Sequence, residues 1–446
     1  MFAARAFHTI LLPVLAGAAL LLAAGCSSTP ALPKGNSQTL AVGAVLPLSG
    51  PNAVLGQSLK QGLTLAVADV NAGGGVNGKP VSLGILDSQS DSTEGAKALQ
   101  TWRERAVPIL FVAENPLVME QAENLADYPQ LVAFLCDYVA VPNLTPKNGV
   151  RIYLNGDQEG RAIEGYLAAA GVNKVAILHA GNLGGQSNAK YLEFLLHGDY
   201  ISTYKDGYTP TERDFRPLVD AMDRLDTDGV VLIGFGPEYA NILAAFGFSG
   251  WKGLVLAYLG QGSLAGLGHQ TGLAATTLYP VPAYVLNPRG TPEGQAFADK
   301  YRALYGQDPD LPAAYAYDNL RALAAGAARA ASLQPQKIRE GFLALKSYPG
   351  AAGTYTIMPD GDTEMPLQLV TGDGQPAPPP PKPTKAAAMS NLPMPAGGLG
   401  SHLIDTLATP PPPANTTTPP SVNPPAGNTT APAPASGNTT PAAPQP

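Results

Sequence analysis

The stretch LPLSGPNAVLGQSLKQGLTLAVADVNAGGG, from Leu46 to Gly75, decides the fold. It opens as the end of an apolar strand, turns at Ser49 to Asn52, and then repeats apolar residues at helical spacing as far as Val70. Three consecutive glycines, at 73–75, end this helix. A strand, a polar turn and a helix in this order form the first unit of an open α/β sheet, in which ligands bind at the carboxyl ends of the strands. The turn that begins at Ser49 therefore stands where a ligand is expected.

The alternation of strand and helix continues along the chain as two successive series. The first has the strands TLAVGAVLPL, VSLGILD, AVPILFVA and QLVAFLC, with a helix from Met119 to Ala126 before the last of them. In the helix after VSLGILD, Asp91 is expected to accept from the first turn while Glu94 reaches back. The second series starts at GVRIYLNG and places helices at 158–170, 187–196, 214–225 and 238–246 between four further strands. Two such series predict an α/β protein with two doubly wound parallel-sheet lobes.

The last part of the globular region is more varied. After TLYPVPAYVLN, helices are predicted at 292–305 and from Leu311 to Ala331. The final piece, GTYTIMPDGDTEMPLQLV, indicates a hairpin whose tight turn runs from Pro359 to Asp362.

The beginning of the chain has the features of an export signal. Residues 1–25 hold Arg5 and then ILLPVLAGAALLLAAG, which is the plan of a secretory signal peptide and is too short to indicate a membrane span. The closing LLAAGC resembles the bacterial lipoprotein box, which implies that Cys26 is diacylated and opens a linker at 26–38. Ala23 departs from the Leu that this box prefers, and a cleaved signal with an incidental Cys26 is the alternative. A diacylated Cys26 would anchor the protein stably to a bacterial membrane, outside the cytoplasm.

The end of the chain is a low-complexity tail at 375–446, composed mostly of Pro, Ala, Thr, Gly and Asn. Such a composition buries too little apolar surface to fold, so we expect a disordered spacer that extends about 3 Å per residue where it is proline-rich. Its Asn-Thr-Thr triplets match the glycosylation sequon, but a spacer is the preferred interpretation. The apolar island SHLIDTLAT, at 401–409, is a candidate docking helix.

Composition excludes several classes of function. The net charge is −7, only 14% of residues are charged, and Lys and Arg form no cluster, so neither nucleic acid nor an anionic membrane surface is an expected partner. The histidines show no metal-ligand spacing, and we predict neither a metal nor a cofactor. If Cys26 is lipidated, Cys136 is the only other thiol and no internal disulfide can form. The segment 185–189 loosely resembles a nucleophile elbow but lacks its second glycine, so no enzymatic activity is predicted.

Several segments match a known family in their order along residues 40–372. They are PLSGPNAVLGQ with GLTLAVADVNAGGGVNGKPV, LDSQSDSTEGAKAL, TPTERDFRPLV, GFGPEYANIL, YGQDPDLPAAYAYDNLRALA and AGTYTIMPDGD. Together they resemble the type I periplasmic binding-protein family, and within it the leucine/isoleucine/valine-binding-like lipoproteins of ABC importers.

This resemblance implies a binding domain at 39–374 in which two lobes are joined by three crossing strands, near 150–154, 279–286 and 354–358. Lobe 1 would comprise about 38–151 with 283–354, and lobe 2 about 152–282 with 355–374. Ligand would bind in the cleft between the lobes and close it by hinge motion.

Residues at the expected cleft depart from the family pattern. In amino-acid-binding members, Ser and Thr hydroxyls and backbone N–H groups of lobe 1 grip the α-carboxylate. The resemblance instead places Glu114 and Asn115 at one strand end and Cys136, Asp137 and Tyr138 at the next. A ligand carboxylate facing Glu114 and Asp137 would be repelled by several kcal/mol in a partly dry cleft, against about 1 kcal/mol in water.

The lobe 2 side of the expected cleft is altered as well. No Asp or Glu occurs between Tyr239 and Pro292, so the acidic partner that family members offer to an ammonium group is missing.

Leu55 and Leu183 stand where Tyr or Trp is common, whereas Phe235 keeps an aromatic ring. The other candidates for ligand contact are Ser49, Asn52, Asn182, Tyr258 and Gln261. A standard zwitterionic amino acid is therefore a less favoured ligand here than in most members.

These candidates also have structural explanations. Glu114 and Asn115 suit the cap of a following helix, Asp137 suits a solvated turn, and Cys136 suits a small buried apolar site. Tyr258 and Gln261 fit either the cleft or the interior of lobe 2.

The resemblance implies an extracytoplasmic solute-binding lipoprotein that delivers an amino acid, or a related amide, urea or short peptide, to an ABC permease in the membrane. Two other interpretations remain open. One is a lipoprotein such as a penicillin-binding-protein activator, which binds a protein partner and regulates cell-wall synthesis while the tail contacts the wall. The other is a sensor that reports its ligand to a membrane receptor.

Overall fold

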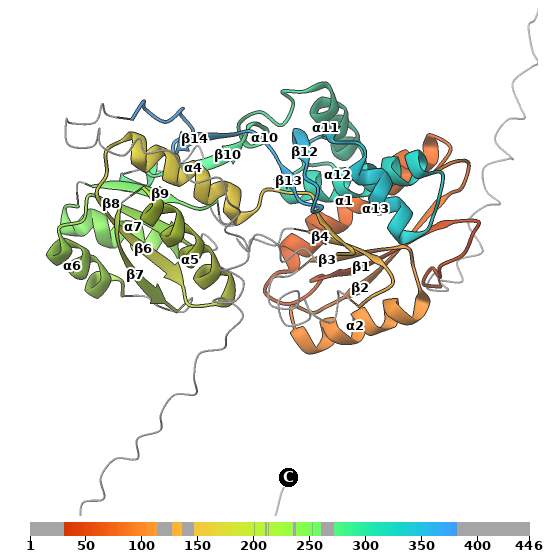
Figure 1. The fold of residues 1–446 in the computed structure, drawn as a ribbon, viewed down its shortest axis with the longest axis horizontal. Helices are drawn as coiled ribbons and strands as arrows, with labels where there is room; N and C mark the ends of the chain where they lie inside the picture. Colours follow the sequence, from red (N-terminus) through yellow and green to blue (C-terminus); the bar gives the residue numbers. More distant parts are fainter. Residues whose placement is uncertain are drawn as a thin grey trace, which may run out of the picture. The chain divides into compact units, whose positions relative to one another are not determined.

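Short apolar runs form two separate, mostly parallel sheets in the computed structural model of the chain (Figure 1). The residues that the structure describes are 31–113, 127–135, 147–199, 201–209, 212, 214–234, 238–251, 253–259 and 272–380. The signal segment, the helix predicted from Met119 to Ala126 and nearly all of the Pro-rich tail lie outside them.

The first sheet has five parallel strands in the order β2-β1-β3-β4-β5. Their bounds are β1 Leu40–Leu46, β2 Val81–Asp87, β3 Ile109–Ala113, β4 Leu131–Leu135 and β5 Gly149–Arg151. Every residue of β1, β3 and β4 is buried, because a parallel sheet in an α/β protein is covered by helices on both faces. Burial on both faces explains why these three strands are continuous apolar runs in the sequence.

Helices from both halves of the chain cover this first sheet. They are α1 Ala53–Ala72, α2 Ser92–Arg105, α11 Pro292–Tyr305, α12 Leu311–Ala330 and α13 Pro335–Leu343. Helix α2 lies on one face, and α1, α12 and α13 lie on the other (Figure 1). Trp102 of α2 is fully buried and its indole N–H donates to the carbonyl of Ala44 in β1, at 3.0 Å.

The capping prediction for α2 is half right. Asp91 accepts from the N–H groups of Thr93 and Glu94, at 2.9 and 3.0 Å. Glu94 does not reach back, because the N–H of Asp91 already donates to the carbonyl of Ser88 and Glu94 pairs with Lys97 instead.

The second sheet has six strands in the order β14-β10-β9-β8-β6-β7. Their bounds are β6 Lys174–Ala180, β7 Ser202–Tyr208, β8 Gly229–Ile233, β9 Leu254–Ala257, β10 Leu278–Pro282 and β14 Leu367–Thr371. Strand β14 runs antiparallel to β10 at the edge, and all other pairs are parallel. The sequence did not predict this antiparallel edge strand, because its pairing partner lies about ninety residues away.

The second sheet is also covered on both faces. Its helices are α4 Gly156–Ala169, α5 Leu183–Gly198, α6 Arg216–Leu225, α7 Tyr239–Ser249 and the short α9 Leu273–Thr276. The short α10 Ala283–Leu286 follows β10, and its Tyr284 hydroxyl donates to the carbonyl of Pro309 at 3.3 Å. Along β6, Val175 and Ile177 pack in one cluster with Leu192 of α5, whereas Ala176 and Leu178 belong to the cluster that contains Phe246 of α7. This two-residue alternation places α5 and α7 on opposite faces.

A small antiparallel sheet completes the fold. Strands β11 Ser347–Pro349, β12 Thr354–Ile357 and β13 Thr363–Glu364 pair in that order, and β12 with β13 forms the predicted hairpin around Gly361. Asp318 of α12 fastens this region by accepting from Ala351 N–H, Ala352 N–H and the Tyr355 hydroxyl, at 2.6, 2.8 and 2.9 Å. Burial raises the pKa of Asp318 to about 6, although these three hydrogen bonds oppose the rise.

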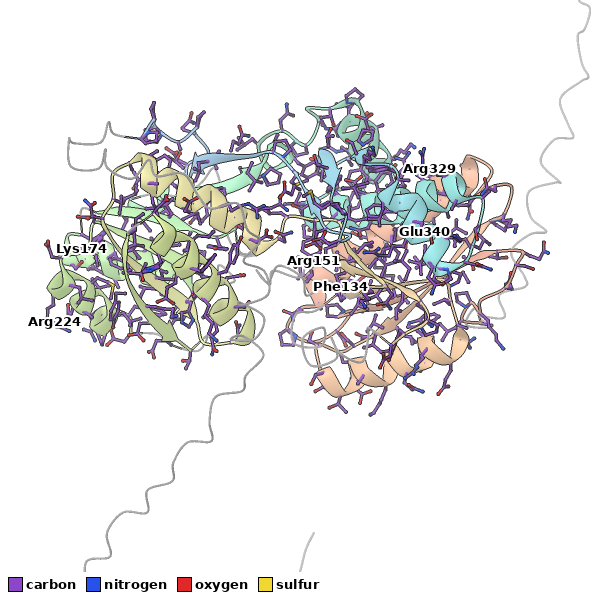
Figure 2. The ribbon with its side chains drawn as sticks, viewed as in Figure 1. Phe134, Arg151, Lys174, Arg224, Arg329 and Glu340 are labelled. Carbon is purple, nitrogen blue, oxygen red and sulfur yellow. The ribbon has the colours of Figure 1, made fainter. Side chains whose placement is uncertain are left out.

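Two segments that run between the sheets are joined side by side. Arg151, the register partner of Phe134 and labelled beside it in Figure 2, is buried and pairs with Asp362 through Nε and Nη2. Gln158 donates to the carbonyl of Thr363 at 2.8 Å and accepts from the N–H of Met365 at 3.0 Å. The start of α4 is thereby fixed to the strand that leads from β13 toward β14.

The predicted class, two doubly wound parallel-sheet lobes of a type I periplasmic binding protein, is confirmed. Several helices begin earlier than predicted: α1 at Ala53 rather than Gln57, α4 at Gly156 rather than 158, and α5 at Leu183 rather than 187. Helix α5 starts early because Asn182 caps it, accepting from the N–H of Gly185 at 2.9 Å. The glycines 184 and 185 therefore belong to the helix and not to a loop.

Candidate functional site

The turn that follows β1 is locked to the end of β2. Leu46 and Asp87, the last residues of the two strands, are register partners. One carboxylate oxygen of Asp87 accepts from the N–H groups of Leu48, Ser49 and Gln89, at 2.8, 3.2 and 2.8 Å. The other accepts from the Ser49 hydroxyl at 2.6 Å. Ser49, a predicted ligand contact, thus holds an acidic side chain of its own lobe.

Further bonds fix the same turn at the carboxyl edge of the first sheet. The hydroxyl of Ser90 donates to the carbonyl of Ser49 at 2.8 Å and accepts from the N–H of Asn52 at 3.1 Å. Gly50 adopts φ +81°, and a Cβ there would lie 2.5 Å from the carbonyl oxygen of Gln89. Only glycine therefore lets the two turns approach this closely.

The carboxylate of Asp87 keeps its negative charge over a wide pH range. Partial burial acts to raise its pKa, but the hydrogen bonds from Ser49, Gln89 and Leu48 outweigh burial and hold the pKa of Asp87 below its usual value. An anionic group therefore stands at the edge where the sequence places the ligand.

The other predicted residues of lobe 1 follow β3 and β4. Ala113 and Leu135, the last residues of these strands, are register partners, so both strands end level at the same edge as the Ser49 turn. Glu114, Asn115, Cys136, Asp137 and Tyr138 come directly after these ends and lie outside the described residues, as do Phe235, Gln261 and Cys26. Their roles stay predictions.

Leu55 is described, and it lies in the interior. It belongs to the first turn of α1, is 8% exposed and packs in the hydrophobic core. Its spacing with Leu59 and Leu63 matches this position, since residues four apart share a helix face. A ligand-lining role for Leu55 stays a prediction.

The second sheet presents its own carboxyl edge where β6, β8 and β9 end. Asn182 and Leu183 follow β6, and the side chain of Asn182 is used as the cap of α5. Tyr258 directly follows β9 and is 3% exposed, with no hydrogen-bond partner for its hydroxyl among the described residues. The structure thus brings Ser49 and Asn52 to one sheet edge, and Asn182, Leu183 and Tyr258 to the corresponding edge of the other sheet.

Side chains from two helices hold the ends of β8 and β9. The Tyr239 hydroxyl of α7 accepts from the N–H of Gly234 at 2.7 Å, and it lies 3.3 Å from the carbonyls of Leu232 and Tyr258. Glu159 of α4 accepts from the N–H of Leu259 at 2.5 Å.

Two buried carboxyl groups stand at this edge of the second sheet. Glu238, at the start of α7, accepts from the Tyr208 hydroxyl at 3.1 Å. Burial raises the pKa of Glu159 to about 8, the Leu259 N–H opposes this rise and the charge of Asp157 adds to it. Lobe 2 therefore carries acidic groups near its ligand edge, although none lies between Tyr239 and Pro292 in the sequence.

Sequence reasoning missed Asp87, Glu159, Glu238 and Tyr239. Asp87 closes an apolar strand, and that position was a usable signal, because a polar residue at the carboxyl end of a parallel strand faces the ligand edge. Glu159 lies in the first turn of α4 and Glu238 is the N-cap residue of α7, positions where an acidic residue is usually explained by the helix dipole; Tyr239 is an aromatic residue of the core.

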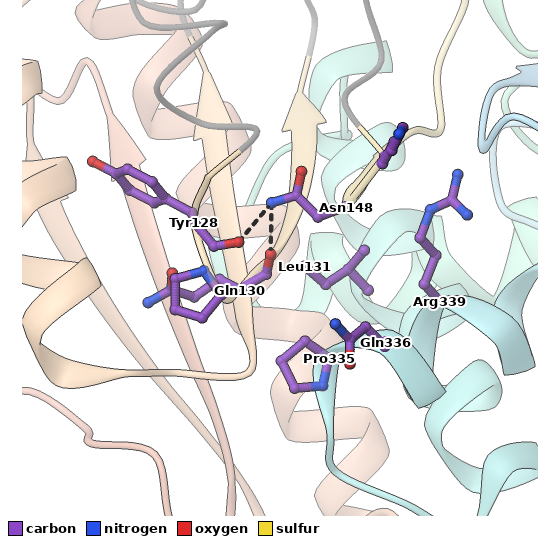
Figure 3. Close-up of a pocket in the computed structure, with 9 residues that line it drawn as sticks. Tyr128, Gln130, Leu131, Asn148, Pro335, Gln336 and Arg339 are labelled. Atoms are coloured by element: carbon purple, nitrogen blue, oxygen red, sulfur yellow. Dashed lines mark hydrogen bonds between the residues drawn. The ribbon is translucent and has the colours of Figure 1, made fainter.

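A pocket of about 230 Å³ occurs in the first lobe at the opposite edge of the sheet (Figure 3). Its lining residues are Tyr128, Pro129, Gln130, Leu131, Lys147, Asn148, Pro335, Gln336 and Arg339. The amide of Asn148 donates to the carbonyls of Tyr128 and Gln130, as the dashed lines in Figure 3 show. Since Leu131 and Asn148 stand at the amino ends of β4 and β5, this pocket is not at the edge where parallel sheets bind ligands.

Neither a metal cluster nor a membrane-spanning helix occurs in the part of the chain that the structure describes. There, His, Cys, Asp and Glu form no group of three or more that could hold a metal ion. No helix in the same residues has the length and hydropathy required to cross a membrane.

Comparison with known proteins identifies the family. Residues 39–376 match the family described as periplasmic binding protein, and the chain belongs to it. A relative in Brucella suis, "Leu/Ile/Val-binding protein homolog 1", is 24% identical over 336 residues, which cover 73% of this chain and 88% of the relative. The chain is therefore an extracytoplasmic solute-binding protein, and its family consists of binding proteins and not of enzymes.

Solved structures share this fold. The branched-chain amino acid transporter substrate-binding protein of Streptococcus pneumoniae, in complex with isoleucine, gives a TM-score of 0.62 at 19% identity and covers 76% of this chain and 98% of that one. A solute-binding protein of Rhodopseudomonas palustris, in complex with benzoate, gives a TM-score of 0.62 at 18% identity and covers 77% and 95%.

Proposed function

We propose that this protein is the lipid-anchored receptor of an ABC importer, which captures an amino acid or a related small polar ligand between two hinged lobes. The observation that carries this proposal is the match to the periplasmic binding protein family along residues 39–376. Two sheets whose carboxyl edges present polar turns, at Ser49 in one and Asn182 in the other, support it.

The proposed lobes follow the sheets. Lobe 1 comprises about 38–151 with 283–354, and lobe 2 about 152–282 with 355–374. The bonded pair of segments at Arg151–Asp362 and Gln158–Met365 supports crossings between the lobes at these positions. The proposed ligand residues on lobe 1 are Ser49, Asn52, Leu55, Glu114, Asn115, Cys136, Asp137 and Tyr138; on lobe 2 they are Asn182, Leu183, Phe235, Tyr258 and Gln261.

The ligand class follows from the relatives and from charge. The two structural relatives hold isoleucine and benzoate, which are both small carboxylates with an apolar body. Asp87 carries a negative charge at the carboxyl edge of the first sheet, and Glu114 and Asp137 follow β3 and β4 in the sequence; negative charges at this edge oppose the carboxylate of a ligand. We therefore infer that amides and cationic ligands compete well against zwitterionic amino acids.

A thermal-shift screen of the purified protein tests this function. The compounds are L-leucine, L-isoleucine, the remaining amino acids, their amides, polyamines and benzoate. A ligand at 100 times its Kd stabilises the folded protein by about 2.7 kcal/mol, which is readily detected. If no compound raises Tm, the importer function fails and partner binding at the cell wall becomes the better explanation.

Two variants sharpen the screen. Asp137→Ala is expected to change which compounds raise Tm, with Asp127→Ala as the matched control at the amino end of β4. An unchanged ligand profile in Asp137→Ala would remove Asp137 from the proposed site.

The lipid anchor is tested separately from the ligand. Incorporation of radioactive palmitate and recovery in the membrane fraction are both expected for the natural chain, and Cys26→Ser should abolish both. Labelling that persists in Cys26→Ser would refute the anchor and leave the ligand-binding proposal intact.

A further inference from the structure

One peptide unit at the ligand edge of the second sheet is held at both of its polar atoms. Its carbonyl, from Tyr258, lies 3.3 Å from the Tyr239 hydroxyl of α7, and its N–H, from Leu259, donates to Glu159 of α4 at 2.5 Å. The Tyr239 hydroxyl also accepts from Gly234 at the end of β8. Two helices thus fix the orientation of the peptide directly after β9 and join it to the neighbouring strand.

The groups that hold this peptide are shielded from water. Glu159 is 1% exposed, and Tyr239 and Tyr258 are each 3% exposed. The titratable groups around Glu159 are Tyr258 after β9, Tyr239 of α7 and Asp157 of α4; the last is paired with Arg161. Among the described residues, no lysine or arginine bonds to Glu159.

We infer that Glu159 is a positioning residue of the ligand edge: with Tyr239 it fixes the Tyr258–Leu259 peptide, and gain or loss of its proton changes the strength of that attachment. The inference rests on the proposed function, since it assigns a role to the edge that would bind the ligand.

Burial explains why the proton matters near neutral pH. Because burial raises the pKa of Glu159 to about 8, the neutral acid predominates at pH 7 and accepts from Leu259 through its carbonyl oxygen. Loss of the proton leaves a buried charge whose only bonded partner in the described residues is the Leu259 N–H. The bond from the Leu259 N–H to this charged acceptor is stronger than its bond to the neutral acid, while burial of the charge lowers the stability of the fold around it.

The test reads the Leu259 amide directly. Labelling with [¹³C-carbonyl]Tyr and [¹⁵N]Leu selects the Tyr–Leu peptide units, which are 153–154, 166–167, 191–192 and 258–259. The Leu259 signal is assigned by its absence in Leu259→Ile. In the natural chain we expect this signal to titrate between pH 7 and 9, with hydrogen exchange of the Leu259 amide accelerated at least about tenfold in Glu159→Ala.

Conservative variants separate positioning from general stability. Glu159→Gln retains a carbonyl oxygen for Leu259 and cannot titrate, so the signal should keep its protection and lose its pH dependence. Glu164→Gln is the matched control, because Glu164 lies on the same helix, also has a raised pKa, of about 7, and is bonded to Asp199 instead. The Leu259 titration should persist in Glu164→Gln.

Two outcomes would overturn the inference. One is a Leu259 signal in the natural chain that is independent of pH from 6 to 9. The other is a titration that remains in Glu159→Gln. No ligand is present in this measurement, so its failure is separate from a failure of the thermal-shift screen.

Discussion

Replacement of Asp87 should loosen the Ser49 turn to a degree that depends on which oxygen is lost. One carboxylate oxygen accepts three backbone N–H groups and the other accepts only the Ser49 hydroxyl. Asp87→Asn keeps the first oxygen, and its new amide N–H can donate to the Ser49 hydroxyl. Asp87→Ala removes all four hydrogen bonds.

The magnitudes follow from the exposure of the partners. Ser49 and Gln89 are exposed and Leu48 is half-buried, so water replaces part of what is lost and each bond contributes about 0.5–1 kcal/mol. Asp87→Ala should therefore cost about 2–3 kcal/mol of local stability, and Asp87→Asn about 1 kcal/mol for the lost charge. Ser49→Ala removes one bond and should also cost about 1 kcal/mol.

Hydrogen–deuterium exchange of peptides that cover 46–52 and 87–92 measures this local opening. Exchange should accelerate about 30- to 150-fold in Asp87→Ala and about fivefold in the other two variants. Because hydrogen bonding lowers the pKa of Asp87, the protection is present above its usual value of 3.8 and declines as the pH falls below it. Equal acceleration in Asp87→Asn and Asp87→Ala would refute the role assigned to the three backbone bonds.

Three further variants test buried contacts in other parts of the chain. Arg151→Met removes the guanidinium that pairs with Asp362 and should cost about 3 kcal/mol in urea unfolding. Adding Asp362→Asn should recover at least about 1 kcal/mol, and strictly additive costs would argue against a coupled pair. Gly160→Ala places a Cβ 2.8 Å from the Tyr258 hydroxyl and should lower Tm, although alanine has the better helix propensity. Combination with Tyr258→Phe removes that hydroxyl and should restore the Tm. A rise in Tm for Gly160→Ala alone would show that the site can hold the extra methyl group. The pKa of Glu159 rises from 4.5 to about 8 on folding, so its contribution to stability is complete below pH 4.5 and is lost as the pH rises through 8, by at most about 5 kcal/mol. Glu159→Gln should therefore equal the natural chain in Tm at pH 5 and exceed it at pH 8.5. The same pH dependence of Tm in both proteins would contradict the assignment.

The fold could be predicted because local patterns determined most elements. Apolar runs became buried parallel strands, and the helix predicted at 292–305 has the bounds Pro292–Tyr305, since Thr291 caps it and Gly306 ends it in the left-handed region. The antiparallel pairing of β14 with β10 could not be predicted, because strand order depends on packing between distant segments.

The candidate site was only partly predictable for a similar reason. The position of Ser49 follows from the strand end, but its partner Asp87 is 38 residues away, and the Leu259 N–H meets Glu159 across 100 residues. No local pattern connects such pairs. The segment between Tyr239 and Pro292 holds no acidic residue, whereas Glu159 reaches this edge from α4, the first helix of the second lobe.

The side-chain amide of Gln158 makes hydrogen bonds to main-chain atoms of the segment it holds, namely the Thr363 carbonyl and the Met365 N–H. Both partners are backbone groups, so side-chain substitutions at 363–365 do not remove them, whereas the buried side chains of Thr363 and Met365 carry constraints of their own. Glutamate, one atom different, has no N–H to offer and would set a negative charge against a carbonyl. Evolutionary change on this strand is therefore limited by Gln158 through its backbone and by the burial of Thr363 and Met365 through its side chains.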